Sequence, residues 1–244
     1  MFLFAAQPTI HRMSRQIVSG IRHFFFPETC SSCDKELPQG VNFICPSCWD
    51  ELNFTHFEKY DTPTSAEQIF WGRIGISHVF PIIYYENGKS IQNILHQIKY
   101  QNAKELAVFM GEVVGKQLTE NTAFQSIDAL VPIPLHGKKE FIRGYNQSLL
   151  IAKGINNHSK QPIIELLKRK KHHESQTKKS REERWKNVKD LFTAISIDQE
   201  IPKHVAIVDD VLTTGSTVES AAMALLEKYP QIKISVITIA IAKS

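Results

Sequence analysis

Two adjacent acids followed by a run of hydroxyl residues form the stretch of this sequence best suited to chemistry. Asp209 and Asp210 come directly after the apolar segment 204–208, and Val211 and Leu212 follow them. The next turn carries four hydroxyls around one glycine: Thr213, Thr214, Gly215, Ser216 and Thr217. Backbone N–H groups at a helix start bind phosphate where a glycine allows close approach. Carboxylates accept hydrogen bonds from sugar hydroxyls or hold hydrated Mg²⁺. The stretch therefore predicts a site for a phosphorylated sugar; an ordinary capped helix is the alternative.

The four cysteines form two Cys-x-x-Cys pairs, Cys30 with Cys33 and Cys45 with Cys48. Two such pairs can surround Zn²⁺ with four thiolates, and such a shell leaves no open position for a substrate. We therefore expect structural zinc that supplies the folding energy of a small ribbon at residues 27–60. A redox-active pair and an iron–sulfur cluster are the less favoured alternatives.

Basic side chains gather at two further places. Residues 136–147 follow a strand that ends in prolines, and they carry Lys138, Lys139 and Arg143, a pattern that predicts a second anion-binding turn. Residues 168–189 are the most basic stretch of the chain. They predict a mobile loop over the site; a solvated surface and a nucleic-acid patch are the alternatives.

The elements that would position these residues alternate between strands and helices. Short apolar and β-branched runs predict strands at 75–80, 82–85, 127–135, 204–208 and 234–240. Apolar residues at helical spacing predict two helices within 90–118, interrupted near Asn102, and further helices at 149–155 and 218–229. The acids would then lie at the carboxyl end of a sheet strand, where ligands of α/β proteins bind.

Composition limits the class of protein. The 244 residues allow one or two domains, and 29 basic against 25 acidic residues are too small an excess to predict nucleic-acid binding from bulk charge. No apolar run reaches the roughly 18 residues that a membrane span needs. Cysteine spacing that suggests metal rather than disulfides favours a cytoplasmic protein.

The segments before the predicted sheet carry weaker signals. Residues 1–26 are expected to form an extension with a short helix at 14–26. This helix is expected to pack against the next module; a position on a membrane surface is the alternative. Residues 51–73 have no strong period, which predicts a linker and the entry to the second domain.

Residues 207–217 closely resemble the phosphoribosyl-pyrophosphate (PRPP) motif of type I phosphoribosyltransferases: apolar residues, two acids, then Thr-Thr-Gly and a hydroxyl. Further segments extend the likeness: the paired cysteines, Val131–His136, Arg143–Gln147, and Ser175–Thr177 with Arg184, Asn187 and Val188. Together they resemble the ComF family of competence proteins, which also includes the gluconate-associated GntX proteins. Tyr145 stands where a Phe is common, and Ser216 where an Ala is.

The resemblance implies an α/β fold, with a type I phosphoribosyltransferase-like parallel sheet flanked by helices over residues 74–244, after a small N-terminal zinc ribbon. It implies that the two acids hold ribose hydroxyls, that 213–217 hold the 5′-phosphate, and that 168–189 form the flexible loop. It also implies a role in natural transformation, in which imported single-stranded DNA enters the cytoplasm alongside a helicase-like partner and a recombination mediator. The PRPP-binding residues it implies are Asp209, Asp210, Val211, Thr213, Thr214, Gly215, Ser216, Thr217, Pro132, Ile133 and Lys99.

Two functions remain open. A phosphoribosyltransferase would displace pyrophosphate from C1 of PRPP, while Mg²⁺ and basic side chains stabilise the leaving group. The predicted catalytic residues are Asp209, Asp210, Arg143 and Arg184, with Lys99 as a further cation. A non-catalytic protein of the uptake machinery would instead bind DNA or protein partners and keep the pocket for a ligand or for the fold alone. Nothing in the sequence identifies an acceptor base.

Overall fold

A computed structural model of the protein describes residues 28–60, 63–170 and 191–242. The chain divides into two compact units, Met1–Glu51 and Leu52–Ser244. The helix predicted at 14–26 and most of the basic stretch 168–189, including Arg184, lie outside the described residues.

The first unit carries its cysteines on short turns. Thr29 and Glu36 form an antiparallel bridge around a turn, and helix α2 (Pro46–Asp50) begins directly after Cys45. In the described part of this unit, Leu37 and Ile44 are the buried apolar side chains other than cysteine. So small a core does not stabilise a fold without further cross-links.

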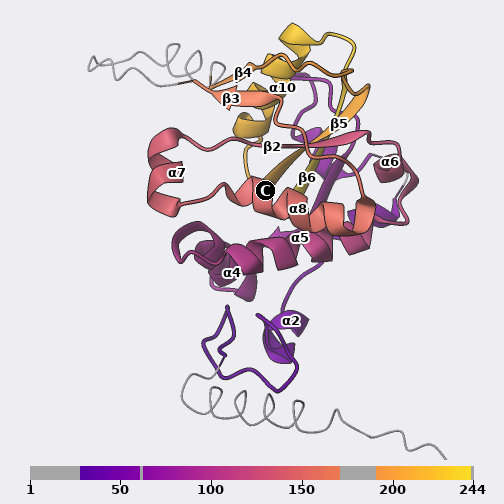
Figure 1. Ribbon diagram of the computed structural model, residues 1–244. Helices are drawn as coiled ribbons and strands as arrows, with labels where there is room; N and C mark the ends of the chain where they lie inside the picture. The colour runs from indigo at the N-terminus through magenta and orange to yellow at the C-terminus, as the bar shows by residue number, and fades with distance from the viewer. Residues whose placement is uncertain (1–27, 61–62, 171–190, 243–244) are drawn as a thin grey trace, which may run out of the picture. The chain divides into compact units, whose positions relative to one another are not determined.

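The second unit is built on a sheet of four parallel strands in the spatial order β1-β6-β5-β2 (Figure 1). The strands are β1 (Val79–Tyr85), β2 (Ala129–Pro132), β5 (His204–Leu212) and β6 (Lys233–Ala242). The two central strands, β5 and β6, are apolar and buried along almost their whole length, as expected where both faces of a sheet are covered. The expected α/β fold with a parallel sheet is therefore confirmed.

Helices cover both faces of this sheet (Figure 1). One face carries α4 (Ser90–Tyr100), α5 (Lys104–Leu118) and α8 (Gln147–Ser159). The other face carries α10 (Ser216–Lys228) and the antiparallel pair of β3 (Leu167–Arg169) and β4 (Phe192–Ala194). Side chains of α10, β3 and β4 share one apolar core with the sheet. The predicted pair of helices within 90–118 is confirmed, with Asn102 in a left-handed conformation between them.

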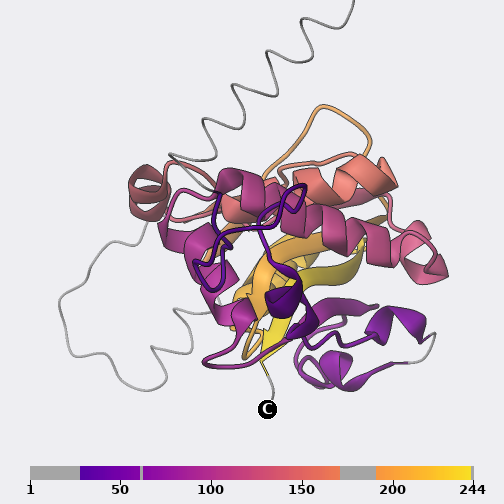
Figure 2. The ribbon, with the colours of Figure 1, turned by 90° about the horizontal axis from the view of Figure 1, so that it is seen from below.

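Helices α5 and α8 lie side by side in close contact (Figure 2). A Cβ atom added to Gly154 would lie 2.1 Å from the carbonyl oxygen of Val108, and one added to Gly111 would lie 2.2 Å from that of Ile151. Only glycine fits at such backbone distances. This contact fixes α8, whose first turn reaches the candidate site.

The structure of residues 51–85 differs from the prediction in two places. In place of the two strands predicted at 75–80 and 82–85 the structure has one, β1, which begins at Val79 and continues through Pro81, because an edge strand tolerates a missing N–H group. The predicted linker contains η1 (Phe57–Lys59) and α3 (Ser65–Gln68), and Phe54 forms an antiparallel bridge with Ile83 of β1. Local periodicity missed these pieces because they are too short to show any.

The basic segment after β2 also differs from its prediction. Instead of a simple turn it contains helix α7 (Gly137–Arg143), capped by the His136 side chain. A further short helix, α6 (Thr122–Gln125), precedes β2. None of the helices in the described ranges is long and apolar enough to cross a membrane.

Candidate functional site

The acid pair lies in the last part of β5, which continues to Leu212 instead of ending at residue 208. Both side chains are buried. Asp209 Oδ1 accepts hydrogen bonds from the hydroxyl of Ser148, at 3.0 Å, and from the N–H group of Asp210, at 2.9 Å. Asp210 Oδ2 lies 3.2 Å from Lys99 Nζ, and apart from this ion pair no described residue donates a hydrogen bond to it. A buried carboxylate oxygen with so few donors has capacity for a ligand.

Burial changes the ionisation of Asp209. Loss of hydration, and after it the negative charge of Asp210, raises the pKa of Asp209 to about 7. A buried carboxyl group beside a negative charge keeps its proton to a higher pH. A cation or a set of hydroxyl donors at this place would favour the ionised form of Asp209.

The hydroxyl-rich turn connects the acids to α10. Gly215 is left-handed, with φ of 76°, and directly precedes the first helical residue. A Cβ atom there would lie 2.8 Å from both Ile69 Cγ2 and Phe70 Cε1. The backbone of the turn therefore packs directly on these two side chains. The hydroxyls of Thr214 and Ser216 lie 3.0 Å apart. Thr213 and Thr214 are exposed, whereas Ser216, Thr217 and Val211 are half-buried.

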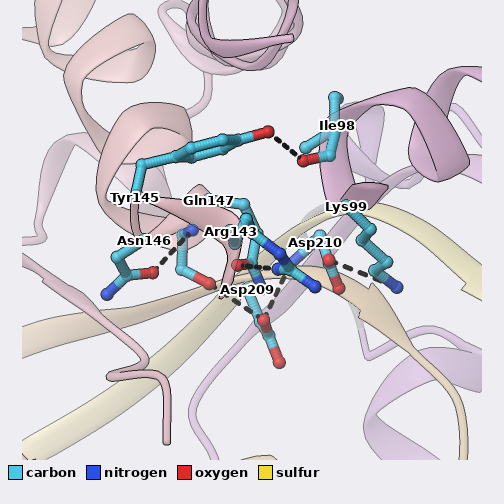
Figure 3. Close-up of polar contacts among 9 residues, drawn as sticks. Ile98, Lys99, Arg143, Tyr145, Asn146, Gln147, Asp209 and Asp210 are labelled. Carbon is cyan, nitrogen blue, oxygen red and sulfur yellow. Dashed lines mark hydrogen bonds and ion pairs between the residues drawn. The ribbon is translucent and has the colours of Figure 1, made fainter. Parts of the chain in front are cut away.

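The segment Arg143–Gln147 connects three parts of the site, and Figure 3 shows its side chains near Ile98, Lys99 and the acid pair. The Tyr145 hydroxyl donates to the carbonyl of Ile98 in α4, next to Lys99. Asn146 caps α8 through the N–H group of Ser148, and its amide nitrogen donates to the carbonyl of Ile133 at 3.0 Å. This single segment thus fixes the helix that carries Lys99, the turn after β2 and the serine that contacts Asp209.

The cations come from separate elements. Arg143 ends α7 and donates to the Gln147 side chain, and its guanidinium lies 5.7 Å from the ring centre of Tyr100. Lys99 comes from the last turn of α4. Figure 3 shows both beside the acid pair. Arg184 cannot be placed with them, since it lies outside the described residues.

The turn after β2 lies beside these groups because β2 pairs with β5. Pro132 ends β2 and is buried, and the N–H group of Ile133 donates to the carbonyl of Val208, one residue before the acids. The acid pair and the turn at Pro132 and Ile133 therefore lie at the same end of two neighbouring parallel strands.

Sequence reasoning missed two polar residues here. Ser148 contacts Asp209, and Arg73 donates to the carbonyl of Thr214 at 2.9 Å. Arg169, at the end of β3, is half-buried with its guanidinium 5.3 Å from the ring centre of Phe192. Burial lowers the pKa of Arg169, and the charge of Asp209 acts in the opposite direction. No local signal marks Ser148 or Arg73, because each reaches the site through a contact between distant segments. Arg169, in contrast, belongs to the basic stretch 168–189 that the sequence singled out.

The four cysteines form a separate cluster in the first unit. The sulfur atoms of Cys30, Cys33, Cys45 and Cys48 all lie within 4.8 Å of one another. Cys33 Sγ and Cys45 Sγ are 3.8 Å apart. Sulfur atoms at ~2.3 Å from a tetrahedral Zn²⁺ would be separated by ~3.8 Å. The N–H groups of Ser32 and Cys45 lie 3.5 and 3.3 Å from Cys30 Sγ, which they would help to keep ionised. The predicted cysteine cluster is therefore confirmed as a group that can hold a metal ion.

Fold and site together define a parallel α/β domain that carries a buried acid pair beside a hydroxyl-rich helix start, joined to a four-cysteine module. No family model matches the chain. It is similar to DNA utilization protein YhgH of Escherichia coli K12, with 31% identity over 205 residues that cover 81% of this chain and 83% of that protein. It is also similar to competence protein F of Haemophilus influenzae, with 28% identity over 202 residues, 80% of this chain and 83% of that protein. Competence protein ComFC of Bacillus subtilis is 36% identical over 110 residues, 45% of this chain and 43% of that protein. The chain belongs to the ComF family.

Proposed function

We propose that the second unit binds PRPP, or a related ribose phosphate, together with Mg²⁺. The observation that carries this proposal is the buried acid pair at the end of β5, directly before a glycine turn and the start of α10. One Asp210 oxygen forms an ion pair with Lys99 and accepts no hydrogen bond from another described residue. Vicinal ribose hydroxyls are donors that match two carboxylates, and a 5′-phosphate matches a helix start. Carboxylates and phosphate oxygens are also the ligands that Mg²⁺ prefers.

The chain's own residues have complementary roles in this binding mode. Asp209 and Asp210 orient the ribose, and Ser148 keeps Asp209 in place. Lys99 and Arg143 supply positive charge for the pyrophosphate group. When bound, Mg²⁺ would neutralise further charge on that group.

The reaction that this arrangement supports best is phosphoribosyl transfer. The bond between C1 of the ribose and the pyrophosphate oxygen would break, and pyrophosphate would leave with the electron pair. An acceptor would form the new bond at C1, where positive charge develops in the transition state. The carboxylates near the ribose and the cations near the leaving group have the signs that stabilise this charge separation.

The proposed cellular role is competence or DNA utilization. Its support is the names of the relatives, two of which are competence proteins and one a DNA utilization protein, at 28–36% identity. In this role the protein would act with imported single-stranded DNA, a helicase-like partner and a recombination mediator.

For the cysteine cluster we propose a structural zinc ion. All four ligands are thiolates, which leaves no position for a substrate, and the spacing of the sulfur atoms fits a tetrahedral shell. The small apolar core of the first unit supports a metal that contributes folding energy.

A second candidate function is non-catalytic binding of DNA or of a protein partner. A surface of exposed apolar side chains beside cations favours it. Phe141 and Ile142 of α7 are 90% and 84% exposed, and Tyr100 is 69% exposed under the guanidinium of Arg143. Lys138 and Lys139 lie on the same short helix. Aromatic rings with cations around them bind single-stranded nucleic acid by stacking and charge.

Calorimetric titration with PRPP and Mg²⁺ would test the first proposal. The protein is expected to bind, and a variant with Asp209→Asn and Asp210→Asn is expected to lose binding while it stays folded. Screening of bases for pyrophosphate release would follow. If the unchanged protein does not bind PRPP, the transferase proposal fails, and salt-dependent binding of single-stranded DNA becomes the next measurement.

A further inference from the structure

Arg73, outside the acid pair and its turn, connects the hydroxyl-rich turn to a distant segment. Its Nη1 donates to two carbonyl oxygens, those of Ile69 and Thr214, each at 2.9 Å. Its Nη2 donates to the carboxylate of Glu219 in the first turn of α10. We propose that Arg73 is a positioning residue that holds the phosphate-binding turn 213–217 in its binding conformation. This inference rests on the proposed function of that turn.

The segment that carries Arg73 is itself rigidly anchored. Glu67 is buried, and its Oε1 accepts the N–H group of Val79 at the start of β1, at 2.8 Å. Its other oxygen accepts both the N–H group and the hydroxyl of Thr64, which completes a capping box at the start of α3. Phe70 is also buried. Glu67 therefore joins the start of α3 to the start of β1, and Arg73, five residues after α3 ends, can transmit that rigidity to the turn.

The turn packs directly on the same segment. Side-chain atoms of Ile69 and Phe70, which directly follow α3, would lie 2.8 Å from a Cβ atom of Gly215, so the backbone of the turn packs directly on these two side chains. Arg73 adds a polar contact one residue earlier, at the carbonyl of Thr214. A fixed carbonyl orients the peptide plane that it belongs to, and therefore the N–H group of Gly215 that would face a phosphate.

Arg73 also neutralises a negative charge that would repel a phosphate from the start of α10. Glu219 places a carboxylate in the first turn of α10, where the positive end of the helix would attract a phosphate. Its side chain is 11% exposed, so water screens the charge poorly. The ion pair with Arg73 neutralises Glu219, which leaves the helix start available to an anionic ligand.

Four variants separate these two effects. Arg73→Met removes both the Thr214 contact and the neutralising charge. Glu219→Gln removes only the carboxylate. The double variant, which combines Arg73→Met with Glu219→Gln, removes the carboxylate and the positioning contact together. Arg73→Lys keeps the charge, but an ammonium group lacks the planar array of N–H donors with which the guanidinium contacts all three acceptors at once. Lys203→Met, at an exposed position before β5, is a control for the loss of one surface charge.

Two measurements are made on each variant of the full chain. The first is amide hydrogen exchange of 213–217 without ligand, and the second is titration with PRPP and Mg²⁺. We expect Arg73→Met to speed exchange in this turn, but not in β6, and to weaken PRPP binding about tenfold, which corresponds to the loss of one hydrogen bond to a charged group. The double variant should stay weak, Arg73→Lys should recover part of the affinity, and Glu219→Gln and Lys203→Met should change little.

Two results would overturn the inference. Unchanged exchange in Arg73→Met would show that the turn holds its conformation without this side chain. Recovery of full affinity in the double variant would show that Arg73 acts only by neutralising Glu219. If the unchanged protein binds no PRPP, the proposed function fails, and the exchange measurement still decides whether Arg73 positions the turn.

Discussion

Burial gives the carboxyl group of Asp209 a pKa that its residue type alone does not predict. Its pKa is raised from 3.8 to about 7, first by loss of hydration and then by the charge of Asp210. In the unfolded chain, the carboxyl would lose its proton near the ordinary value. Between these two pKa values the folded protein binds more protons than the unfolded chain, so its stability must fall as the pH rises.

Replacement of Asp209 by Asn should remove this pH dependence. We expect the free energy of unfolding of the unchanged, ligand-free protein to fall by roughly 2 kcal/mol between about pH 5 and about pH 8, relative to Asp209→Asn. Urea unfolding of both proteins at a series of pH values measures this free energy. Parallel pH profiles of the two proteins would contradict the raised pKa. PRPP affinity should rise over the same range, because the ribose hydroxyls and Mg²⁺ favour the ionised pair.

Tyr145 shows how one hydroxyl supports the site without contact to the acids. The ring is buried, and the hydroxyl donates to the carbonyl of Ile98, next to Lys99. Tyr145→Phe should keep the packing of the ring and lower the free energy of unfolding by about 1 kcal/mol, the usual net contribution of a hydrogen bond. Chemical denaturation measures this change. A variant as stable as the unchanged protein would show that the bond contributes nothing.

Among the elements, the contact of α5 with α8 should be the most sensitive to a single methyl group. Gly154→Ala would place Cβ 2.1 Å from the carbonyl oxygen of Val108, which belongs to backbone and cannot rotate away. The helices must separate, so we expect a loss of about 2–4 kcal/mol in the free energy of unfolding.

A second glycine provides the control for this helix contact. Gly137, at the exposed start of α7, has no atom within 4 Å of an added Cβ, and Gly137→Ala should therefore change stability little. Thermal unfolding compares the two variants. Equal melting temperatures would mean that α5 and α8 adjust to the methyl group at no cost.

At the scale of the whole molecule, the two units should differ in their response to metal removal. We expect a strong chelator, or Cys30→Ser, to unfold the first unit, because Leu37 and Ile44 give it little apolar core. Residues 52–244 have their own core and should remain folded. Amide exchange resolved along the chain measures both units at once, with metal analysis of the untreated protein as the reference. Protection that persists around the cysteines after chelation would contradict a structural metal.

Local chemistry determined much of this protein from the sequence alone. The acid pair, the hydroxyls and Gly215 are consecutive, so their place at the end of a strand and the start of a helix follows from local patterns. The paired cysteines are similarly close in sequence, and the turns between them bring the sulfur atoms together. The buried strands could be predicted because residues covered on both sides form continuous apolar runs.

Tertiary structure alone decided which distant groups meet these residues. Ser148 reaches Asp209 from α8, and Arg73 reaches the turn from the segment after α3. No spacing in the sequence encodes these contacts, since they depend on strand order and on how closely helices pack. Pro81 gives a further example: whether a strand tolerates proline depends on its place at the edge of the sheet, which exists only once all four strands are assembled.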